Sequence, residues 1–472
     1  MTKILIKNVD VIATMDAKGN EYTNHDILLD GQTIEKIDRD IQELNVARTI
    51  DGRGKIAFPG FVNVHHHMYQ IFTRDLTRIL GARGLFDWLE MNYLIWGSLT
   101  EEMVYVSALT GLALLMKTGC TLASDMYYIF PRNASKKLID AQIQAARELG
   151  LRFHPTRGAV SSIEAPDALA PPNVCQTDDE ILQDYERLVN TYHNPDPFSM
   201  LRIGLAPVNP VTSTESLLIE TIKFARKHDL RCHTHLAESP QENEWSMNKH
   251  GMREFDYMES IGWVGPDVWY AHCLYLTDDE IERMGKYNCG MAHCPICNTK
   301  NAVIAPIFKM MDAGIKVGFG VDGMGGYGDM VTELQTALTL HTYRFTKDGQ
   351  RGKLGLDLAR EMLRIASKGG AEVLGWDEVG SLEPGKAADI VLFNVNLLDF
   401  AGCTTDLVTS FVSYGSNHKV DTSIINGEVV IDKGELCKVD EHSIVERANS
   451  LSKDFLERAR KETGIDYTKA RS

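Results

Sequence analysis

The chain has 472 residues, of which 44% are hydrophobic and 24% charged, and this usage is ordinary for a globular protein. Its formal net charge of −16 argues against a general nucleic-acid or anionic-membrane binder. The first residues lack the apolar core of a signal peptide, and no apolar stretch has the roughly 18 residues of a membrane span. Nine scattered cysteines fit free thiols in a reducing compartment. We therefore expect a soluble, cytoplasmic protein without nucleic-acid or membrane partners.

Residues 3–55 alternate short β-type runs with turns. Apolar pairs and triplets around Ile4, Val11 and Ile27 are separated by turn signals such as Asp30-Gly31. This pattern predicts a group of short strands at the start of the chain.

The middle of the chain shows a different pattern, in which short apolar runs alternate with segments of helical periodicity. Eight such runs cover residues 61–67, 120–125, 151–157, 202–208, 230–235, 268–272, 289–293 and 317–322. Eight β/α units predict a (β/α)₈ TIM barrel. A doubly wound open sheet is the alternative, and the lack of a glycine-rich phosphate turn after the first strand disfavours it. Insertions over residues 68–100 and 163–177 would lie over the catalytic end of such a barrel, unless they only pad the surface.

A second β-type region lies near the other end of the chain. Residues 386–393 predict a strand, and residues 422–431 predict a hairpin around an Asn426-Gly427 turn. Neither terminal region has enough apolar surface to fold alone, so we predict that the two form one small β-sandwich.

These patterns divide the chain into three parts. The composite β-sandwich takes residues 1–58 and 383–435, and the barrel takes residues 59–382. The remaining residues, 436–472, predict a C-terminal helical tail in the form of a solvated amphipathic helix.

Histidine or aspartate stands at the end of six of the eight runs, Asp125 among them. The first run ends in His65-His66-His67, and in an extended segment the side chains of His65 and His67 point the same way. The carboxyl ends of barrel strands meet on one face. Imidazoles with one carboxylate there would form a site for a borderline metal rather than for calcium. The other ends carry His233, His235, His272, His293 and Asp322, and Glu238 follows His235 by three residues.

The chain contains parts of two other metal-binding motifs. Cys294 and Cys297 have the spacing of a zinc knuckle, but no second pair of ligands supports one. The deaminase motif in which histidine and glutamate are separated by one residue also fails, because two residues separate His235 from Glu238.

The motifs around these residues resemble the amidohydrolase superfamily, and most closely its mononuclear branch of cytosine and guanine deaminases. The resemblance rests on residues 59–67, 235–238, 271–273, 293–295, 321–323 and 380–391, in this order along the chain. Residues 65–70, 125–131 and 151–158 resemble the subgroup of 8-oxoguanine deaminase and hydroxyatrazine ethylaminohydrolase. The resemblance implies a distorted barrel and a β-sandwich built from both termini. It also implies one metal, because the metal-bridging lysine of the binuclear branch is missing from residues 205–210.

Roles for individual residues follow from this resemblance. One divalent metal per chain would be held by His65, His67, His235 and Asp322. Zinc is the expected metal, although iron occurs in the branch. The catalytic residues would be Glu238, His272 and Asp322. Glu238 would shuttle protons, His272 would orient the attacking water and polarise the substrate, and Asp322 would take the second proton. His293 would either support the site or be structural.

Several residues near the expected site could recognise the substrate. Gln70 could bond a ring carbonyl or ring nitrogen, Arg157 a carbonyl or an anionic ring, and Trp88, Tyr127 or Tyr128 could stack on a flat ring. The alternatives are that Trp88 and Tyr127 only pack and that Arg157 neutralises a carboxylate. The chain also departs from its relatives after Asp322, where residues 324–329 replace their usual turn.

The expected reaction is hydrolytic deamination of a nitrogen-rich aromatic heterocycle, with an oxopurine such as 8-oxoguanine as first substrate. A pterin such as isoxanthopterin, or an s-triazine that loses an amine or chloride, is the alternative. A catalytically dead scaffold is disfavoured, since the full ligand set is present. The family also makes a homo-oligomer an expectation.

Overall fold

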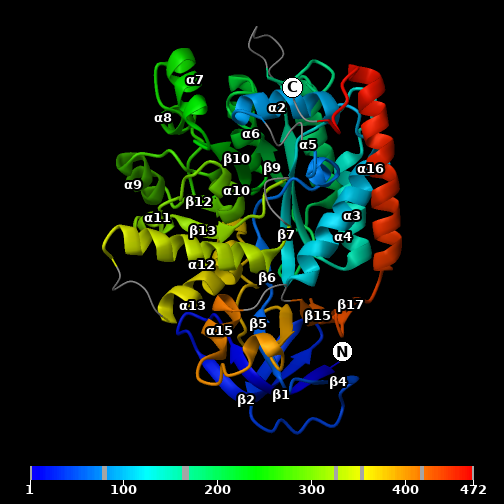
Figure 1. Ribbon diagram of the computed structural model, residues 1–472, viewed down its shortest axis with the longest axis vertical. Helices are drawn as coiled ribbons and strands as arrows, with labels where there is room; N and C mark the ends of the chain where they lie inside the picture. The colour runs from blue at the N-terminus through cyan, green and yellow to red at the C-terminus, as the bar shows by residue number, and fades with distance from the viewer. Residues whose placement is uncertain are drawn as a thin grey trace.

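The computed structural model describes residues 3–76, 82–161, 169–323, 328–350, 356–414 and 419–469. These residues form an eight-stranded parallel barrel and a separate nine-stranded mixed sheet, which lie one above the other in Figure 1. The predicted fold class is confirmed. No helix in these ranges is both long and apolar enough to cross a membrane.

The barrel strands follow one another in chain order, and each pairs in parallel with the next. All eight lie within or overlap the runs predicted from the sequence. The barrel is nearly closed, because the amide of Val64 donates to the carbonyl of Phe319 at 2.9 Å. The strands are β6 (Phe61–Asn63), β7 (Cys120–Tyr127), β8 (Arg152–Ala159), β9 (Gly204–Pro207), β10 (Cys232–Leu236), β11 (Val268–His272), β12 (Gly290–His293) and β13 (Lys316–Phe319).

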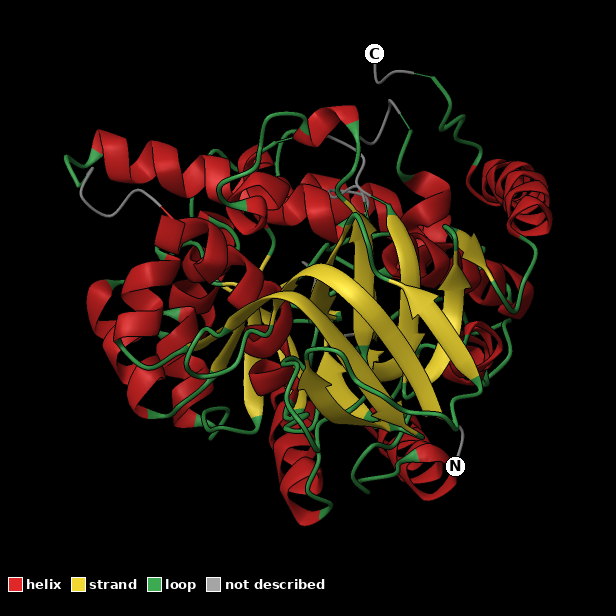
Figure 2. Ribbon diagram, turned by 90° about the horizontal axis from the view of Figure 1, so that it is seen from below, coloured by secondary structure: helices red, strands yellow, loops and turns green. Residues whose placement is uncertain are grey.

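Helices surround the barrel on its outside, as Figure 2 shows. Three of them begin with a capping box at Thr177, Ser239 and Thr277, which fixes where each helix starts. The helices after the first strand are η1 (Met68–Thr73), α2 (Leu85–Trp96), α3 (Glu101–Lys117), α4 (Leu138–Leu149), α5 (Asp178–Tyr192), α6 (Glu215–Lys227), α7 (Pro240–His250), α8 (Glu254–Ser260) and α9 (Asp278–Lys286). They continue with α10 (Pro295–Lys300), α11 (Ile307–Asp312), α12 (Met330–Lys347), α13 (Leu356–Arg364), η3 (Ile365–Gly369), α14 (Gly370–Leu374), η4 (Leu398–Phe400), α15 (Leu407–Ser413) and α16 (Glu441–Thr463).

The mixed sheet joins the two ends of the chain. β5 pairs in parallel with β1 and antiparallel with β14, so strands from both termini share one ladder. Alternate residues of β1 enter different apolar clusters: Ile4 and Ile6 lie in one, and Leu5 lies in the other. The strands are β1 (Lys3–Ala13), β2 (Glu21–Asp30), β3 (Thr33–Asp38), β4 (Arg48–Asp51), β5 (Lys55–Pro59), β14 (Ile390–Asn394), β15 (Val420–Ile425), β16 (Glu428–Asp432) and β17 (Glu435–Leu436). The domain boundaries at residues 58, 383 and 435 stay a proposal.

The C-terminal segment packs more closely than a solvated tail. Helix α16 runs along the side of the barrel next to α3 (Figure 1) and buries Ile444, Phe455 and Ala459. The ring of Phe455 lies 6.2 Å from that of Phe72 in η1. The helix therefore forms part of the outer layer, with only its other face exposed.

Candidate active site

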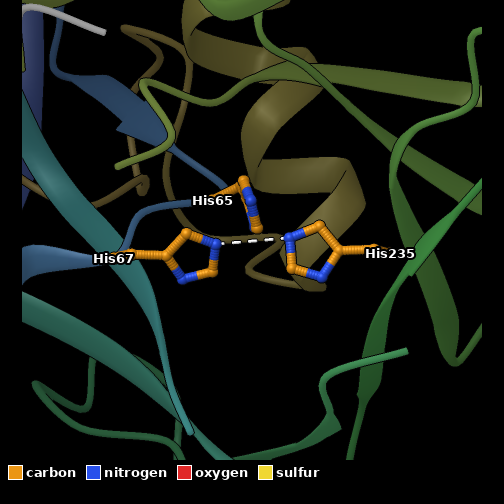
Figure 3. Close-up of side chains that lie close together, drawn as sticks. All are labelled: His65, His67 and His235. Atoms are coloured by element: carbon orange, nitrogen blue, oxygen red, sulfur yellow. Dashed lines mark hydrogen bonds between the residues drawn. The ribbon is translucent and has the colours of Figure 1, made fainter. Parts of the chain in front are cut away.

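Histidines from two distant strands meet at the carboxyl end of the barrel. The Nε2 atoms of His67 and His235 lie 3.2 Å apart, and ligand atoms of both fall within 4.8 Å of one from His65 (Figure 3). Asp322 Oδ1 lies 3.4 Å from Nε2 of His65 and 3.5 Å from Nε2 of His67. The structure thus brings together the four residues expected to hold the metal.

The other ring nitrogen of two of these histidines is held by the backbone. Nδ1 of His67 donates to the carbonyl of Met126 at 2.8 Å, and Nδ1 of His235 donates to the carbonyl of Val208 at 2.7 Å. Because a carbonyl can only accept, each Nδ1 carries the hydrogen and each Nε2 presents a lone pair. Two lone pairs that face each other repel unless a cation lies between them.

His65 is oriented through a second imidazole. His233 Nδ1 donates to the carbonyl of Trp269 at 2.9 Å, so Nε2 of His233 accepts from Nδ1 of His65 at 2.7 Å. Nε2 of His65 therefore also has a lone pair, and among the described residues this buried atom has no hydrogen-bond partner. Three such nitrogens and a carboxylate fit a divalent metal that accepts nitrogen and oxygen ligands, as zinc does.

Burial sets the charges at this centre. It lowers the pKa of His65, His67 and His235, so all three are neutral near pH 7. Burial also opposes the charge of Asp322, but the adjacent imidazoles of His65, His272 and His67 hold the pKa of that carboxyl well below its usual range. Neutral imidazoles and an ionised carboxylate are the forms that bind a metal.

The backbone adopts unusual conformations at the same place. His272 and Asp322, which lie at and just after strand ends, have φ angles of 71° and 56°. Ala237, directly before Glu238, has a φ of 47°. Such left-handed conformations are costly for residues other than glycine and concentrate at functional sites.

Glu238 and His272 lie beside the four ligands. Oε2 of Glu238 is 3.7 Å from Nε2 of His272, which is 4.0 Å from Oδ2 of Asp322. Nδ1 of His272 donates to the amide oxygen of Asn298 at 3.2 Å, and this bond turns Nε2 toward the centre. Burial raises the pKa of Glu238, which suits a group that takes up and releases a proton.

Glu238 and His272 line a cavity of about 550 Å³. Helix α2, from the first predicted insertion, forms an apolar wall through Leu85, Trp88 and Leu89, and Arg83 and Lys300 also line the cavity. Residues 162–168 of the second insertion lie outside the described residues. The lining also includes His67, Gln70, Tyr128, Val208, Asn209, His235, Glu238, His272, Cys297, Asn301 and Asp322.

The structure separates the residues predicted to bind substrate into two groups. Gln70 and Trp88 line the cavity, whereas Arg157 and Tyr127 do not. Arg157 is fully buried and donates from Nε to Asp184 of α5 at 2.9 Å. Tyr127 is its register partner on the neighbouring strand, so both side chains lie on the barrel face that meets the helices. The prediction of substrate contacts is therefore corrected for these two residues, and Arg157 neutralises a carboxylate instead.

The structure also shows where His293 lies, whose role the sequence did not decide, and it reveals two residues that the sequence did not predict. His293 does not line the cavity, and its Nε2 lies 3.3 Å from Nε2 of His341. Asn209 lines the cavity and Asn298 holds His272, and neither was predicted. A signal for Asn209 existed, because it directly follows the fourth predicted run, where a barrel places its site residues.

A parallel barrel whose strand ends carry three histidines and an aspartate around one point defines a metal-dependent hydrolase. Residues 56–430 match the model of the amidohydrolase family, and the chain belongs to this family.

Two relatives share most of its length. The chain is 34% identical to 8-oxoguanine deaminase of Pseudomonas aeruginosa over 406 residues, which are 85% of this chain and 88% of that protein. It is 32% identical to hydroxydechloroatrazine ethylaminohydrolase of Pseudomonas sp. strain ADP over 462 residues, which are 96% and 95% of the two chains.

Among solved structures, the chain resembles atrazine chlorohydrolase from Arthrobacter aurescens TC1 complexed with zinc. The TM-score is 0.89 at 30% identity, and the match covers 95% of this chain and 100% of that chain.

Proposed function

We propose that the protein hydrolytically removes an amino group from a nitrogen-rich aromatic heterocycle, with an 8-oxoguanine-like oxopurine as the first candidate substrate. One divalent metal per chain, zinc in the first place, would be held by His65, His67, His235 and Asp322. The observation that carries this proposal is the convergence of these ligand atoms beside a cavity that Glu238 and His272 line.

Held by His65, His67, His235 and Asp322, a zinc ion would lower the pKa of bound water toward about 7 and so supply a nucleophile at neutral pH. Glu238 accepts a proton from the attacking water and delivers it to the ring nitrogen beside the reacting carbon, which makes that carbon more electrophilic. Asp322 accepts the second proton and passes it to the departing amine. His272, held by Asn298, presents Nε2 to the same space and polarises the reacting group.

The walls of the cavity suit a flat ring. Trp88 and Tyr128 provide aromatic surface, and Gln70 adds polar atoms near Asp322. The similarity to 8-oxoguanine deaminase supports an oxopurine.

An s-triazine that loses an amine or chloride, or a pterin such as isoxanthopterin, is the second candidate. The similarities to hydroxydechloroatrazine ethylaminohydrolase and to atrazine chlorohydrolase favour the triazine. Glu238 favours amine loss over chloride loss, because a leaving nitrogen needs a proton and chloride does not. The homo-oligomer expected from the family stays an expectation.

A screen for release of ammonia or an alkylamine over oxopurines, pterins and aminated s-triazines tests the proposal, with chloride release from atrazine measured in parallel. We expect ammonia from at least one oxopurine and none after the metal is removed with a chelator. Chloride release alone would favour the second candidate, and no release of either kind would contradict both.

A further inference from the structure

Asn209 lies in the wall of the cavity and has no role in the chemistry above. It follows β9, next to Val208, whose carbonyl accepts from Nδ1 of His235 at 2.7 Å. Asn209 is only 3% exposed, yet it lines the cavity. Its side chain therefore faces the site close to one of the metal ligands.

Two hydrogen bonds fix which end of the Asn209 amide is available. The backbone N–H of Thr212 donates to Oδ1 of Asn209 at 3.0 Å, and the hydroxyl of Thr212 donates to the same oxygen at 2.8 Å. A backbone N–H cannot accept, so the oxygen must face Thr212 and the NH₂ group must face the other way. Within the described part of the chain no group accepts from Nδ2, and this nitrogen is not sealed from the cavity. Asn209 therefore offers a ligand two N–H donors and no acceptor.

We propose that Asn209 determines specificity by donating from Nδ2 to an oxo group of the heterocycle. This inference rests on the proposed function and narrows its substrate class to rings that carry an oxo group. A ring that carries an amino group or a hydrogen in place of the oxo group cannot accept from Nδ2, so the buried N–H donors of Asn209 stay without a partner when it binds. A site built to hydrogen-bond one group rejects the analogue without it more strongly than an apolar pocket does.

The substitution Asn209→Asp tests the polarity of this contact. The substitution keeps the shape of the side chain, and one carboxylate oxygen still accepts from Thr212. The second carboxylate oxygen takes the place of the NH₂ group, so an acceptor replaces a donor. Binding is measured by calorimetry in the Glu238→Gln background, in which turnover is slowed. We expect 8-oxoguanine to bind roughly 10- to 100-fold more weakly after Asn209→Asp. Asn209→Ala, which adds no charge, should lose a similar factor.

Two controls separate recognition from damage to the turn. Thr212→Val removes one of the bonds that hold Asn209 but leaves the NH₂ group in place, so we expect less than about a threefold loss of 8-oxoguanine binding. 2-Aminopurine, which carries no oxo group, should bind alike with and without Asn209→Ala. Metal content and thermal midpoint should stay unchanged in all variants.

Equal binding of 8-oxoguanine with and without the Asn209 substitutions, or no binding to the Glu238→Gln enzyme at all, would overturn the inference. If 8-oxoguanine binds as expected but the native enzyme releases no ammonia from it, the proposed reaction is contradicted and the role of Asn209 in binding stands.

Discussion

Two buried polar groups, one at each end of the barrel, differ in how their atoms are paired. At the amino end, Arg152 donates to both carboxylate oxygens of Asp389 at 3.0 Å, and this fully buried pair joins the barrel to the mixed sheet. At the carboxyl end, Nε2 of His65 is equally buried but has no hydrogen-bond partner among the described residues. Buried groups that satisfy one another contribute to folding, whereas buried lone pairs aimed at one point are explained by a cation.

The largest effect should come from the carboxyl end, through the substitution Glu238→Gln. Because the amide cannot accept and deliver the proton, we expect turnover to fall by about 10²- to 10⁴-fold while one equivalent of metal stays bound. Steady-state kinetics and metal analysis on the same sample check this. Glu282→Gln on helix α9 is the control, and full activity of Glu238→Gln would remove Glu238 from the mechanism.

At the amino end, the substitution Asp389→Asn should affect stability and not chemistry. It leaves the Arg152 guanidinium buried without its carboxylate, and breaking such a pair costs about 3–5 kcal/mol. Urea unfolding measures this loss, and kcat of the folded enzyme should stay unchanged. The double variant Arg152→Met/Asp389→Asn should recover part of the stability, because no unpaired charge remains. A loss below about 1 kcal/mol in Asp389→Asn would contradict this description of the pair.

A smaller effect should distinguish two buried histidines, one at each end. His233→Phe keeps the ring stacked on Trp269, 4.4 Å away, but removes the acceptor for Nδ1 of His65. We expect a metal affinity about 10- to 100-fold lower. His154, whose Nδ1 accepts from Trp376 at 3.0 Å, is the matched control. His154→Phe should lower stability and leave metal affinity unchanged, and equal metal affinities in the two variants would contradict the comparison.

The sequence predicted the barrel and the histidines and acids at its strand ends because both depend on short-range patterns, whereas the choice of four metal ligands among them came from the family resemblance. Each ligand stands at or just after a strand end, and topology alone brings such positions together. The side chains of Arg157 and Tyr127 required more, namely the register of β7 and β8 and the face of the barrel to which each residue belongs. A shift of one residue along a strand moves a side chain from the barrel interior to the face that packs against the helices.

Other features depend on contacts between segments far apart in the chain. The acceptor that holds His272 is Asn298, which stands 26 residues further along the chain. The sequence predicts a solvated C-terminal helix because ten of its 23 residues are charged, yet Phe455 is buried against the barrel. Sequence periodicity shows that one face of a helix is apolar but not which surface covers it.

The central claim is that His65 and His67, which follow β6, hold one metal together with His235 of β10 and Asp322. The run His65-His66-His67 offers a direct test. His66 is buried like its neighbours, but its Nδ1 accepts from the backbone of His67 and takes no part in the cluster. Zinc analysis of protein purified without added metal should find about one equivalent per chain in the native protein and in His66→Asn, and far less in His67→Asn. Equal zinc in His66→Asn and His67→Asn, or none in the native protein, would contradict the account.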